Sequence, residues 1–260
     1  MTELPSLPTI ETPLFATMRG VIGDVLESAG LAVLRGPVGI GKSFALDRVC
    51  QSLADQGETV FLLTAGGSLE GKVIEFCRAI HGRMGVSASE GLDLAFHELS
   101  GFPFRAYGKR VVLVVDEAQE LKAAILALVR ELWDRGEIAR LGDRNSPSFG
   151  LVLVGNDQFL SDGSRKDRVN LLPLLDRVSH DVRLARPTGT DIANFAANLF
   201  PETLPEYLQL RERAQAFAEQ RGNFRGIATA VRQALLRADR EGVSVQVKHL
   251  DKAIRMMGGR

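Results

Sequence analysis

The sequence predicts an α/β domain with a parallel sheet flanked by helices, followed by a small domain made only of helices. Up to residue 187, short apolar runs alternate with stretches of helical periodicity, as in folds whose parallel strands are joined by crossover helices. From Thr188 onward only the helical periodicity remains. We therefore expect three parts: an N-terminal arm and leading helix at 1–28, an α/β core at 29–187 and a helical domain at 188–260.

The N-terminal part begins with a proline-rich stretch. Pro5, Pro8 and Pro13 predict an extended arm over residues 1–13, because proline lacks the N–H group that a helix interior needs. Apolar residues at helical spacing then predict a leading helix over residues 15–28.

The core alternates strands and helices. Its third strand contains the near-continuous apolar run VVLVVD, which is typical of a parallel strand covered on both faces. The first expected strand begins at Leu31, and the later strands are expected at 59–63, 110–116, 149–154 and 182–184. The first expected core helix begins at Ser43, and the later core helices are expected at 69–83, 89–99, 120–135 and 169–176. The expected C-terminal helices are 191–199, 207–220, 224–240 and 247–257.

Composition narrows the class of protein. The chain has 260 residues, of which 45% are apolar, so a substantial core is possible. Lysine plus arginine equals aspartate plus glutamate at 32 each, so overall charge indicates neither nucleic acid nor a membrane surface. Cys50 and Cys77 lie in apolar helical patterns, which predicts reduced, packed thiols. With no signal-peptide pattern and no long apolar run, we expect a soluble, cytoplasmic protein without a membrane partner.

A glycine-rich motif follows the first strand. Gly36 and Gly41, with Lys42 and Ser43, give the spacing GxxxxGKS at a predicted strand-to-helix turn. Glycines and a helix N-terminus expose backbone N–H groups to an anion, so this loop is expected to bind the phosphates of ATP. Lys42 would reach the β/γ-phosphates and Ser43 would ligate Mg²⁺. The expected nucleotide-binding residues are Gly36, Pro37, Val38, Gly39, Ile40, Gly41, Lys42, Ser43 and Phe44.

Polar residues end two of the later strands. Asp116 is expected to hold the Mg²⁺ of the nucleotide, and the adjacent Glu117 to orient and deprotonate the attacking water. The alternative is a solvated acidic strand end. Asn156 follows the next strand and would lie beside the γ-phosphate, although a turn formed by Gly-Asn-Asp also accounts for it.

Other conspicuous residues are assigned to structure. Trp133 adjoins an apolar helical stripe of Leu121, Ile125, Leu128 and Leu132, so we expect it in the core rather than stacked on a base. The four histidines lack metal-ligand spacing with one another or with the cysteines, and we expect no second metal site.

The motifs GPVGIGKS and VVLVVDEAQ, together with Asn156, resemble those of AAA+ ATPases, in which the C-terminal helices form a lid. Within that superfamily the chain is similar to the B protein of phage Mu and the related target-selecting ATPases of transposons. The similarity extends over residues 9–257. Its segments are TIETPLF, VVDEAQEL, GLVLVGNDQFL, LLDRVSHDVRL and GNFRGIATAVRQALLRA.

The resemblance implies two further functional arginines. Arg225 corresponds to the sensor-2 arginine that reads the γ-phosphate, with an exposed helix arginine as the alternative. Arg177 corresponds to the arginine that enters a neighbouring subunit's site, and Arg168 and Arg183 are alternatives for that role. Relatives of this kind form ATP-dependent rings or helical filaments on duplex DNA and recruit a transposase, in bacteria or phage-infected hosts.

The same resemblance implies DNA contacts by the loops at residues 65–72 and 81–89. Lys72, Arg83 and Ser87 are the candidates for phosphate contacts, with solvated side chains as the alternative. Aromatic residues are not interleaved with basic ones, so we expect binding without sequence preference. Three other functions stay open: an ExeA-like secretion-assembly ATPase, which shares the DEAQ signature, a helicase-loader-like ATPase, and a P-loop kinase of a small molecule.

Overall fold

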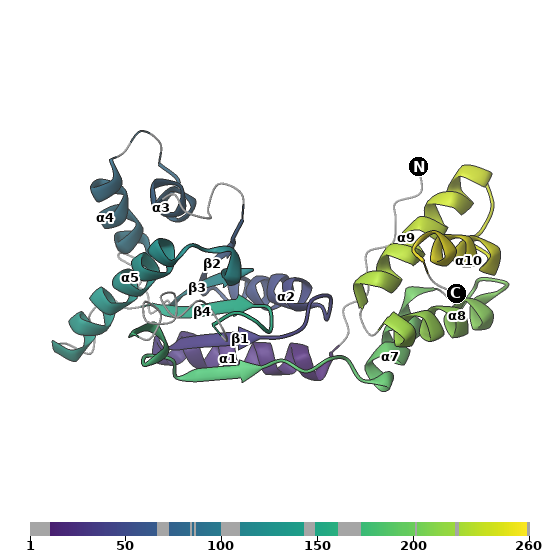
Figure 1. Ribbon diagram of the computed structural model, residues 1–260, viewed down its shortest axis with the longest axis horizontal. Coiled ribbons are helices and arrows are strands. Elements are labelled where there is room, and N and C mark those ends of the chain that lie inside the picture. Colours follow the sequence, from purple (N-terminus) through teal and green to yellow (C-terminus); the bar gives the residue numbers. More distant parts are fainter. Residues whose placement is uncertain are drawn as a thin grey trace. The chain divides into compact units, whose positions relative to one another are not determined.

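The computed structural model describes residues 11–66, 73–83, 85, 87–99, 110–142, 149–160, 173–200, 202–221 and 224–258 (Figure 1). It divides into two compact units, which we describe in turn. The first consists of Thr17–Gly36 and Ser43–Leu184. The second consists of the residues up to Ala16, the loop Pro37–Lys42, and the residues from Ala185 onward.

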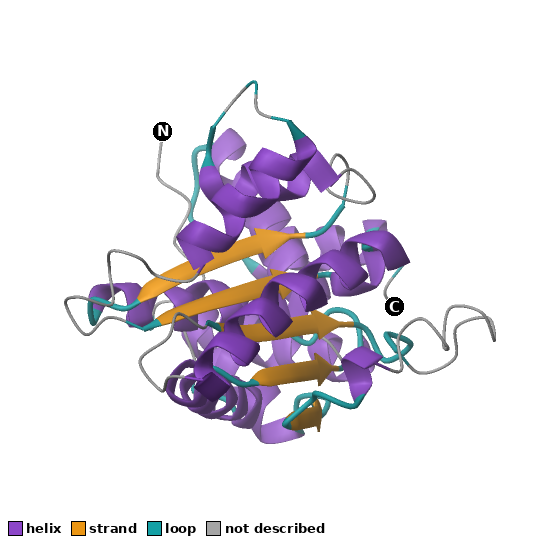
Figure 2. Cartoon of the chain, turned by 90° about the vertical axis from the view of Figure 1, so that its left-hand side faces the viewer, coloured by secondary structure: helices purple, strands orange, loops and turns teal. Residues whose placement is uncertain are grey.

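The first unit is built on the parallel sheet that the sequence predicts (Figure 2). Its strands lie in the order β2-β3-β4-β1-β5. In this register Leu34 lies opposite Val154 on one side and Val182 on the other. The strands are β1 (Leu31–Arg35), β2 (Thr59–Thr64), β3 (Val111–Asp116), β4 (Gly150–Gly155) and β5 (His180–Arg183).

Helices cover both faces of this sheet. Helices α3 (Val73–His81), α4 (Ala88–Leu99) and α5 (Ala123–Gly142) share one apolar core with inward residues of β1, β3 and β4. Helix α1 (Pro13–Ser28) lies on the opposite face, where a Cβ added to Gly150 would meet the carbonyl oxygen of Val25 at 2.7 Å.

The direction of the chain places helix α2 (Lys42–Asp55) on the same face of the sheet as α1. The chain crosses the sheet from β1 to β2 and returns through β3 and β4, so right-handed crossovers put α2 opposite α3, α4 and α5. Strands β3 and β4 are therefore covered on both sides, and every residue in them is buried. This explains their apolar sequences.

The start of α1 corrects the prediction of an extended arm as far as residue 13. The helix begins at Pro13, and the backbone N–H of Phe15 donates to Oγ1 of Thr12 at 3.2 Å. Proline is favourable at the first helical position, because an N–H group there has no partner within the helix. Residues 1–10 of the predicted arm lie outside the described part of the chain.

Other predicted boundaries in the core are also wrong, including the end of the helix predicted at 120–135, which continues to Gly142. Helix α3 ends at His81 rather than 83, because Gly82 turns the chain with a φ of 70°. The helix expected at 120–135 is instead a short 3-10 helix, η3 (Ala118–Glu120), followed by α5, with the extended residue Leu121 after η3. Strand β5 begins at His180, two residues before the predicted start. Of the helix expected at 169–176, residues 173–175 are described and helical.

Several core assignments are confirmed. Trp133 is buried, and its Nε1–H donates to the carbonyl oxygen of Ala29 at 3.1 Å. Cys50 and Cys77 are free and buried. Burial, with a contribution from Asp47, raises the pKa of the Cys50 thiol to about 12, so the thiolate that would react is scarce. No helix in the described ranges combines the length and apolar character needed to span a membrane.

The core of the first unit can be tested with two isoleucines. Ile125 is fully buried in the cluster beneath α5, whereas Ile74 in α3 is 39% exposed. We expect Ile125→Ala to lower the free energy of unfolding by about 2–5 kcal/mol, and Ile74→Ala to have a much smaller effect. Urea unfolding followed by the fluorescence of Trp133, the one tryptophan of the chain, measures both. Equal effects would contradict the packing of α5 described above.

In its described residues from Ala185 onward, the second unit contains four helices with a core of their own. Phe195 and Phe224 pack with ring centroids 5.0 Å apart. Thr188 and Asp191 form a reciprocal capping box at the start of the first helix, which fixes where the helical part begins. The helices are α7 (Gly189–Leu199), α8 (Tyr207–Arg221), α9 (Phe224–Glu241) and α10 (Val247–Met256).

A buried histidine joins α9 to α10. Nδ1 of His249 accepts a hydrogen bond from the backbone N–H of Gln246 at 3.0 Å, so we assign the ring proton to Nε2. Nε2 lies 3.0 Å from Oε2 of Glu241 and donates to it. This hydrogen bond lowers the pKa of the Glu241 carboxyl below its ordinary 4.5, with Lys248 and Lys252 acting in the same direction.

The sign of the resulting pH dependence follows from linkage. Because the pKa of Glu241 is lower in the folded state, its contribution to stability is present above pH 4.5 and is lost as the pH falls through the folded-state pKa. We expect Glu241→Gln to make unfolding less dependent on pH below 4.5 than in the unsubstituted protein. Acid titration followed by circular dichroism tests this, with the exposed Glu212→Gln as control. An identical titration for both variants would contradict the expectation.

Candidate active site

The candidate site lies at the carboxyl edge of the sheet. Because β4 pairs with β3 on one side and β1 on the other, the ends of these three strands are neighbours. They carry Asp116 after β3, Asn156 after β4, and Gly36 after β1. The carboxyl edge of a parallel sheet is where ligands bind in open α/β folds.

The glycine-rich loop connects β1 to α2. The N–H of Gly36 donates to the carbonyl oxygen of Gly155 at 3.2 Å, which ties the start of the loop to the end of β4. Gly39 and Gly41 have φ angles of 85° and 98°, which side-chain-bearing residues rarely adopt. The loop ends at Lys42, the first residue of α2. The N-terminus of this helix, where backbone N–H groups can bind an anion, therefore lies at the end of the loop.

The other loop residues differ in exposure. Lys42 is buried, and its Nζ donates to the carbonyl oxygen of Pro37 at 2.8 Å. Ile40 is buried, whereas the side chain of Val38 is 66% exposed. Ser43 is exposed in the first turn of α2. The half-buried Phe44 places its ring 5.3 Å from the guanidinium carbon of Arg48.

The expected metal ligands are chemically suited to Mg²⁺. Asp116 is buried at the end of β3, and its Oδ1 accepts the backbone N–H of Glu117 at 2.9 Å. Ser43 offers a hydroxyl oxygen, and Mg²⁺ prefers such oxygen ligands while retaining several waters and phosphate oxygens. The described residues contain no group of three or more His, Cys, Asp or Glu side chains arranged for a metal.

Glu117 has an uncommon backbone conformation. Its φ of 53° and ψ of 38° lie in the left-handed region, which costs a residue with a side chain about 1–3 kcal/mol. The carboxylate is held as well, since Nε2 of Gln119 donates to its Oε2 at 2.6 Å. Both the backbone and the side chain of the expected base are therefore fixed.

The side chain of Asn156 takes part in a turn, which was the alternative explanation of its position. Its Oδ1 accepts the backbone N–H of Gln158 at 2.9 Å. Its own backbone N–H donates to Oε1 of Gln119 at 3.1 Å. The assignment of Asn156 beside the γ-phosphate stays a prediction. It concerns the side-chain amide nitrogen, because the side-chain oxygen takes part in the turn.

The candidate trans-acting arginines have different surroundings. Arg177 pairs with Asp134, with Nε to Oδ1 at 2.5 Å, and its Nη1 donates to the carbonyl oxygen of Pro173 at 2.5 Å. To enter a neighbour's site this guanidinium would have to leave both partners. The side chain of Arg183 is 79% exposed and lies 3.3 Å from Asp157. Arg168 lies outside the described residues.

Arg225 lies in the second unit, exposed in the first turn of α9. The residue before it contacts the glycine-rich loop, which belongs to the same unit. The backbone N–H of Phe224 donates to the carbonyl oxygen of Gly39 at 3.2 Å. Its ring lies 3.6 Å from where a Cβ of Gly41 would be. The start of α9 is thereby attached to the loop expected to hold phosphate.

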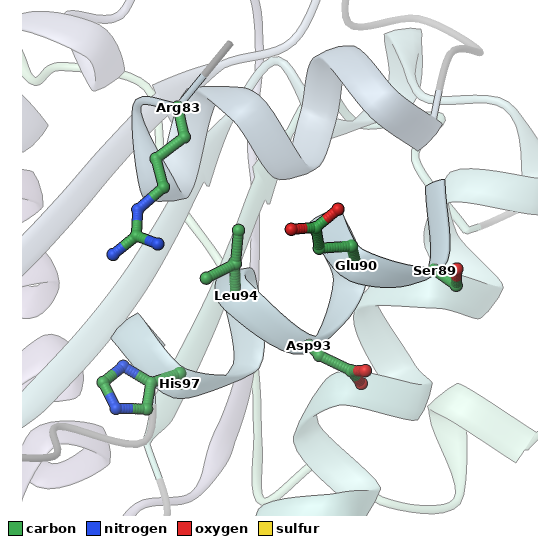
Figure 3. Close-up of a pocket in the computed structure, with 6 residues that line it drawn as sticks. All are labelled: Arg83, Ser89, Glu90, Asp93, Leu94 and His97. Carbon is green, nitrogen blue, oxygen red and sulfur yellow. The ribbon is translucent and has the colours of Figure 1, made fainter. Parts of the chain in front are cut away.

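The predicted DNA-contact residues have mixed surroundings. Arg83 is exposed, but it lines a hollow shared with the carboxylates of Glu90 and Asp93 (Figure 3). Those carboxylates would repel a phosphate. Ser87 caps α4, because its Oγ accepts the backbone N–H of Glu90 at 3.3 Å. Lys72 lies outside the described residues.

Sequence reasoning missed Gln119 as a functional candidate. Its signal was present, because the residue is the last of the DEAQ string and lies two positions after Glu117. Its connection to Asn156, 37 residues further along the chain, becomes visible only once β3 and β4 are paired.

Comparisons with known proteins identify the family. Residues 25–161 match the family described as an AAA domain. Similar solved structures include the Aeropyrum pernix ORC2 protein in its ADP form, with a TM-score of 0.68 and 18% identity over 98% of this chain and 70% of that one. Cdc6p from Pyrobaculum aerophilum has a TM-score of 0.66 and 20% identity over 98% and 69%. The A. pernix ORC1 protein in complex with DNA has a TM-score of 0.61 and 19% identity over 96% and 67%.

No curated protein matches the chain. The structural similarities, all at low identity, support the fold, and the family match covers more than half of the sequence. The chain therefore belongs to the AAA family and is an ATPase whose α/β P-loop core is followed by C-terminal helices.

Proposed function

We propose that this ATPase binds duplex DNA without sequence preference in its ATP-bound state, oligomerises there, and recruits and stimulates a transposase. The observation that carries this proposal is the pair of segments VVDEAQEL and GLVLVGNDQFL, which resemble those of target-selecting ATPases of the phage Mu B kind. Residues Gln119 and Asn156 of these two segments are hydrogen-bonded in the structure. The activity would operate in the cytoplasm of a bacterial or phage-infected cell.

The DNA part of the proposal has separate support. Structures similar to this chain include the A. pernix ORC1 protein in complex with DNA and the Drosophila ORC bound to DNA. The chain has no net charge, so a basic surface for DNA would have to be local or completed by stacked subunits. This predicts that binding depends on assembly rather than on the single chain.

In the proposed ATPase cycle, each site residue has a separate role. Lys42 binds the β/γ-phosphates, while Ser43 and Asp116 would hold the Mg²⁺ that neutralises phosphate charge. Glu117 accepts the proton of the attacking water, and Asn156 positions the γ-phosphate. Arg225 and a neighbour's Arg177 would then sense and stabilise the charge on the transferred group. ATP binding stabilises the oligomer and hydrolysis weakens it.

The proposal is tested by fluorescence anisotropy of a random-sequence DNA duplex with ATP, with ADP and without nucleotide, over a series of salt concentrations. We expect cooperative binding that requires ATP and falls steeply with salt, as backbone contacts do. Sedimentation of the same samples reports the oligomer. Equal particle size and equal DNA affinity in all three nucleotide states would contradict the proposal.

A second candidate is an ATPase that loads or remodels a replication protein ring. It is favoured by the similarity to Cdc6p and to domain III of the Thermotoga maritima replication initiation protein DnaA, the latter with a TM-score of 0.51. Pull-down assays with a purified replicative helicase and with a purified transposase, each with ATP and with ADP, distinguish the two. ATP-dependent capture of the helicase alone would favour the second candidate.

A further inference from the structure

Gln119 links two predicted catalytic residues through opposite ends of one amide. Its Nε2 donates to Oε2 of Glu117 at 2.6 Å, and its Oε1 accepts the backbone N–H of Asn156 at 3.1 Å. A longer contact of 3.5 Å joins the same Nε2 to Oε1 of Glu120. The short bond to Glu117 is of the charge-assisted kind, which fixes geometry more strongly than a bond between neutral groups.

The bond leaves one oxygen of Glu117 available. Within the described part of the chain, Oε1 of Glu117 has no hydrogen-bond partner. The backbone N–H of Glu117 is held by Asp116, and its left-handed conformation fixes the direction in which the side chain leaves the strand. The carboxylate is therefore held directly at Oε2, and the backbone that carries it is restrained by its N–H bond and its dihedral angles.

We propose that Gln119 is a positioning residue for ATP hydrolysis, which holds Glu117 so that Oε1 faces the attacking water and which couples that orientation to Asn156. This inference rests on the proposed role of Glu117 as the base. Since Asn156 is expected at the γ-phosphate, a shift of the β4 end on nucleotide binding would be transmitted to the Glu117 carboxylate through the amide.

The amide chemistry makes the proposal specific. Glutamate at position 119 would keep an oxygen for the N–H of Asn156 but has no N–H for Glu117, and its charge would repel that carboxylate. Alanine would remove both bonds. If Gln119 only joined the ends of β3 and β4, glutamate would restore what alanine loses. If it orients Glu117, both variants are impaired.

The test is the steady-state kinetics of ATP hydrolysis by Gln119→Ala and Gln119→Glu in the full chain. We expect kcat to fall about 10-fold or more in both, with KM for ATP within about 2-fold, because a misplaced catalytic group affects the chemical step rather than binding. The matched control is Gln158→Ala, which changes an exposed glutamine two residues after Asn156 and keeps the backbone N–H that bonds to Asn156. Thermal unfolding confirms that each variant is folded.

The outcomes separate this inference from the assignment of the base. Unchanged kcat in Gln119→Ala, or recovery of kcat in Gln119→Glu, would overturn the inference. Retained hydrolysis in Glu117→Gln would instead overturn the role of Glu117. In the Glu117→Gln background, single-turnover assays should show no further loss on adding Gln119→Ala, because residues that act as a unit are not additive. A further loss there would also overturn the inference.

Discussion

Glu117→Gln is expected to lower kcat for ATP hydrolysis by about 10²–10⁴-fold, which is the usual contribution of a positioned general base. The amide has nearly the shape of the carboxylate but cannot accept the proton of the attacking water. Because Glu117 is assigned to the attacking water and not to the phosphates, we expect the Kd for ATP to change by less than about 3-fold, an amount below 1 kcal/mol. Coupled-enzyme assays and calorimetric titration measure the two quantities.

The matched control is Glu120→Gln, the same change three positions away on an exposed carboxylate of η3. We expect its kcat to stay near that of the unsubstituted enzyme. Hydrolysis lost equally in both variants would indicate that charge at this edge, rather than the base, is responsible. Under the proposed function, Glu117→Gln should also stay assembled on DNA after ATP is added, because the cycle would stop before hydrolysis.

The fold was predictable where the sequence pattern has one structural interpretation. VVLVVD is apolar up to its final Asp116 and GLVLVG has no polar side chain, and they form the fully buried strands β3 and β4. Likewise, GPVGIGKS lies between a strand and a helix, as its glycines and lysine predict. These assignments depend only on residues that are close together in the sequence, so one amino-acid sequence is sufficient to make them.

The parts that could not be predicted depend on contacts between distant segments. The bond from Asn156 to Gln119 spans 37 positions, and the ion pair from Arg177 to Asp134 spans 43. Both join segments that are far apart in the sequence and that only the fold brings together. Pro13 was misassigned for a local reason, since proline interrupts a helix interior but favours its first position, and the capping contact to Thr12 decides between the two.

Lys42→Met is expected to raise the Kd for ATP by about 10–100-fold, because a hydrogen bond to a charged group is worth about 1.5–3 kcal/mol. Methionine retains much of the length and apolar stem of the buried lysine, so the loop should keep its packing. In the structure the ammonium donates to the carbonyl oxygen of Pro37, and phosphate oxygens would compete for that donor. Titration with a fluorescent ATP analogue measures the affinity.

Two controls make the result interpretable. Lys122→Met makes the same substitution at an exposed lysine before α5 and should leave the Kd unchanged. Lys42→Arg keeps the charge, so affinity that is partly retained there and lost in Lys42→Met would assign the effect to the cation. An unchanged Kd in a folded Lys42→Met protein would contradict the assignment of the loop. Since the proposed DNA assembly requires bound ATP, Lys42→Met should also fail to assemble on DNA at ATP concentrations that saturate the unsubstituted protein, and higher ATP should restore assembly.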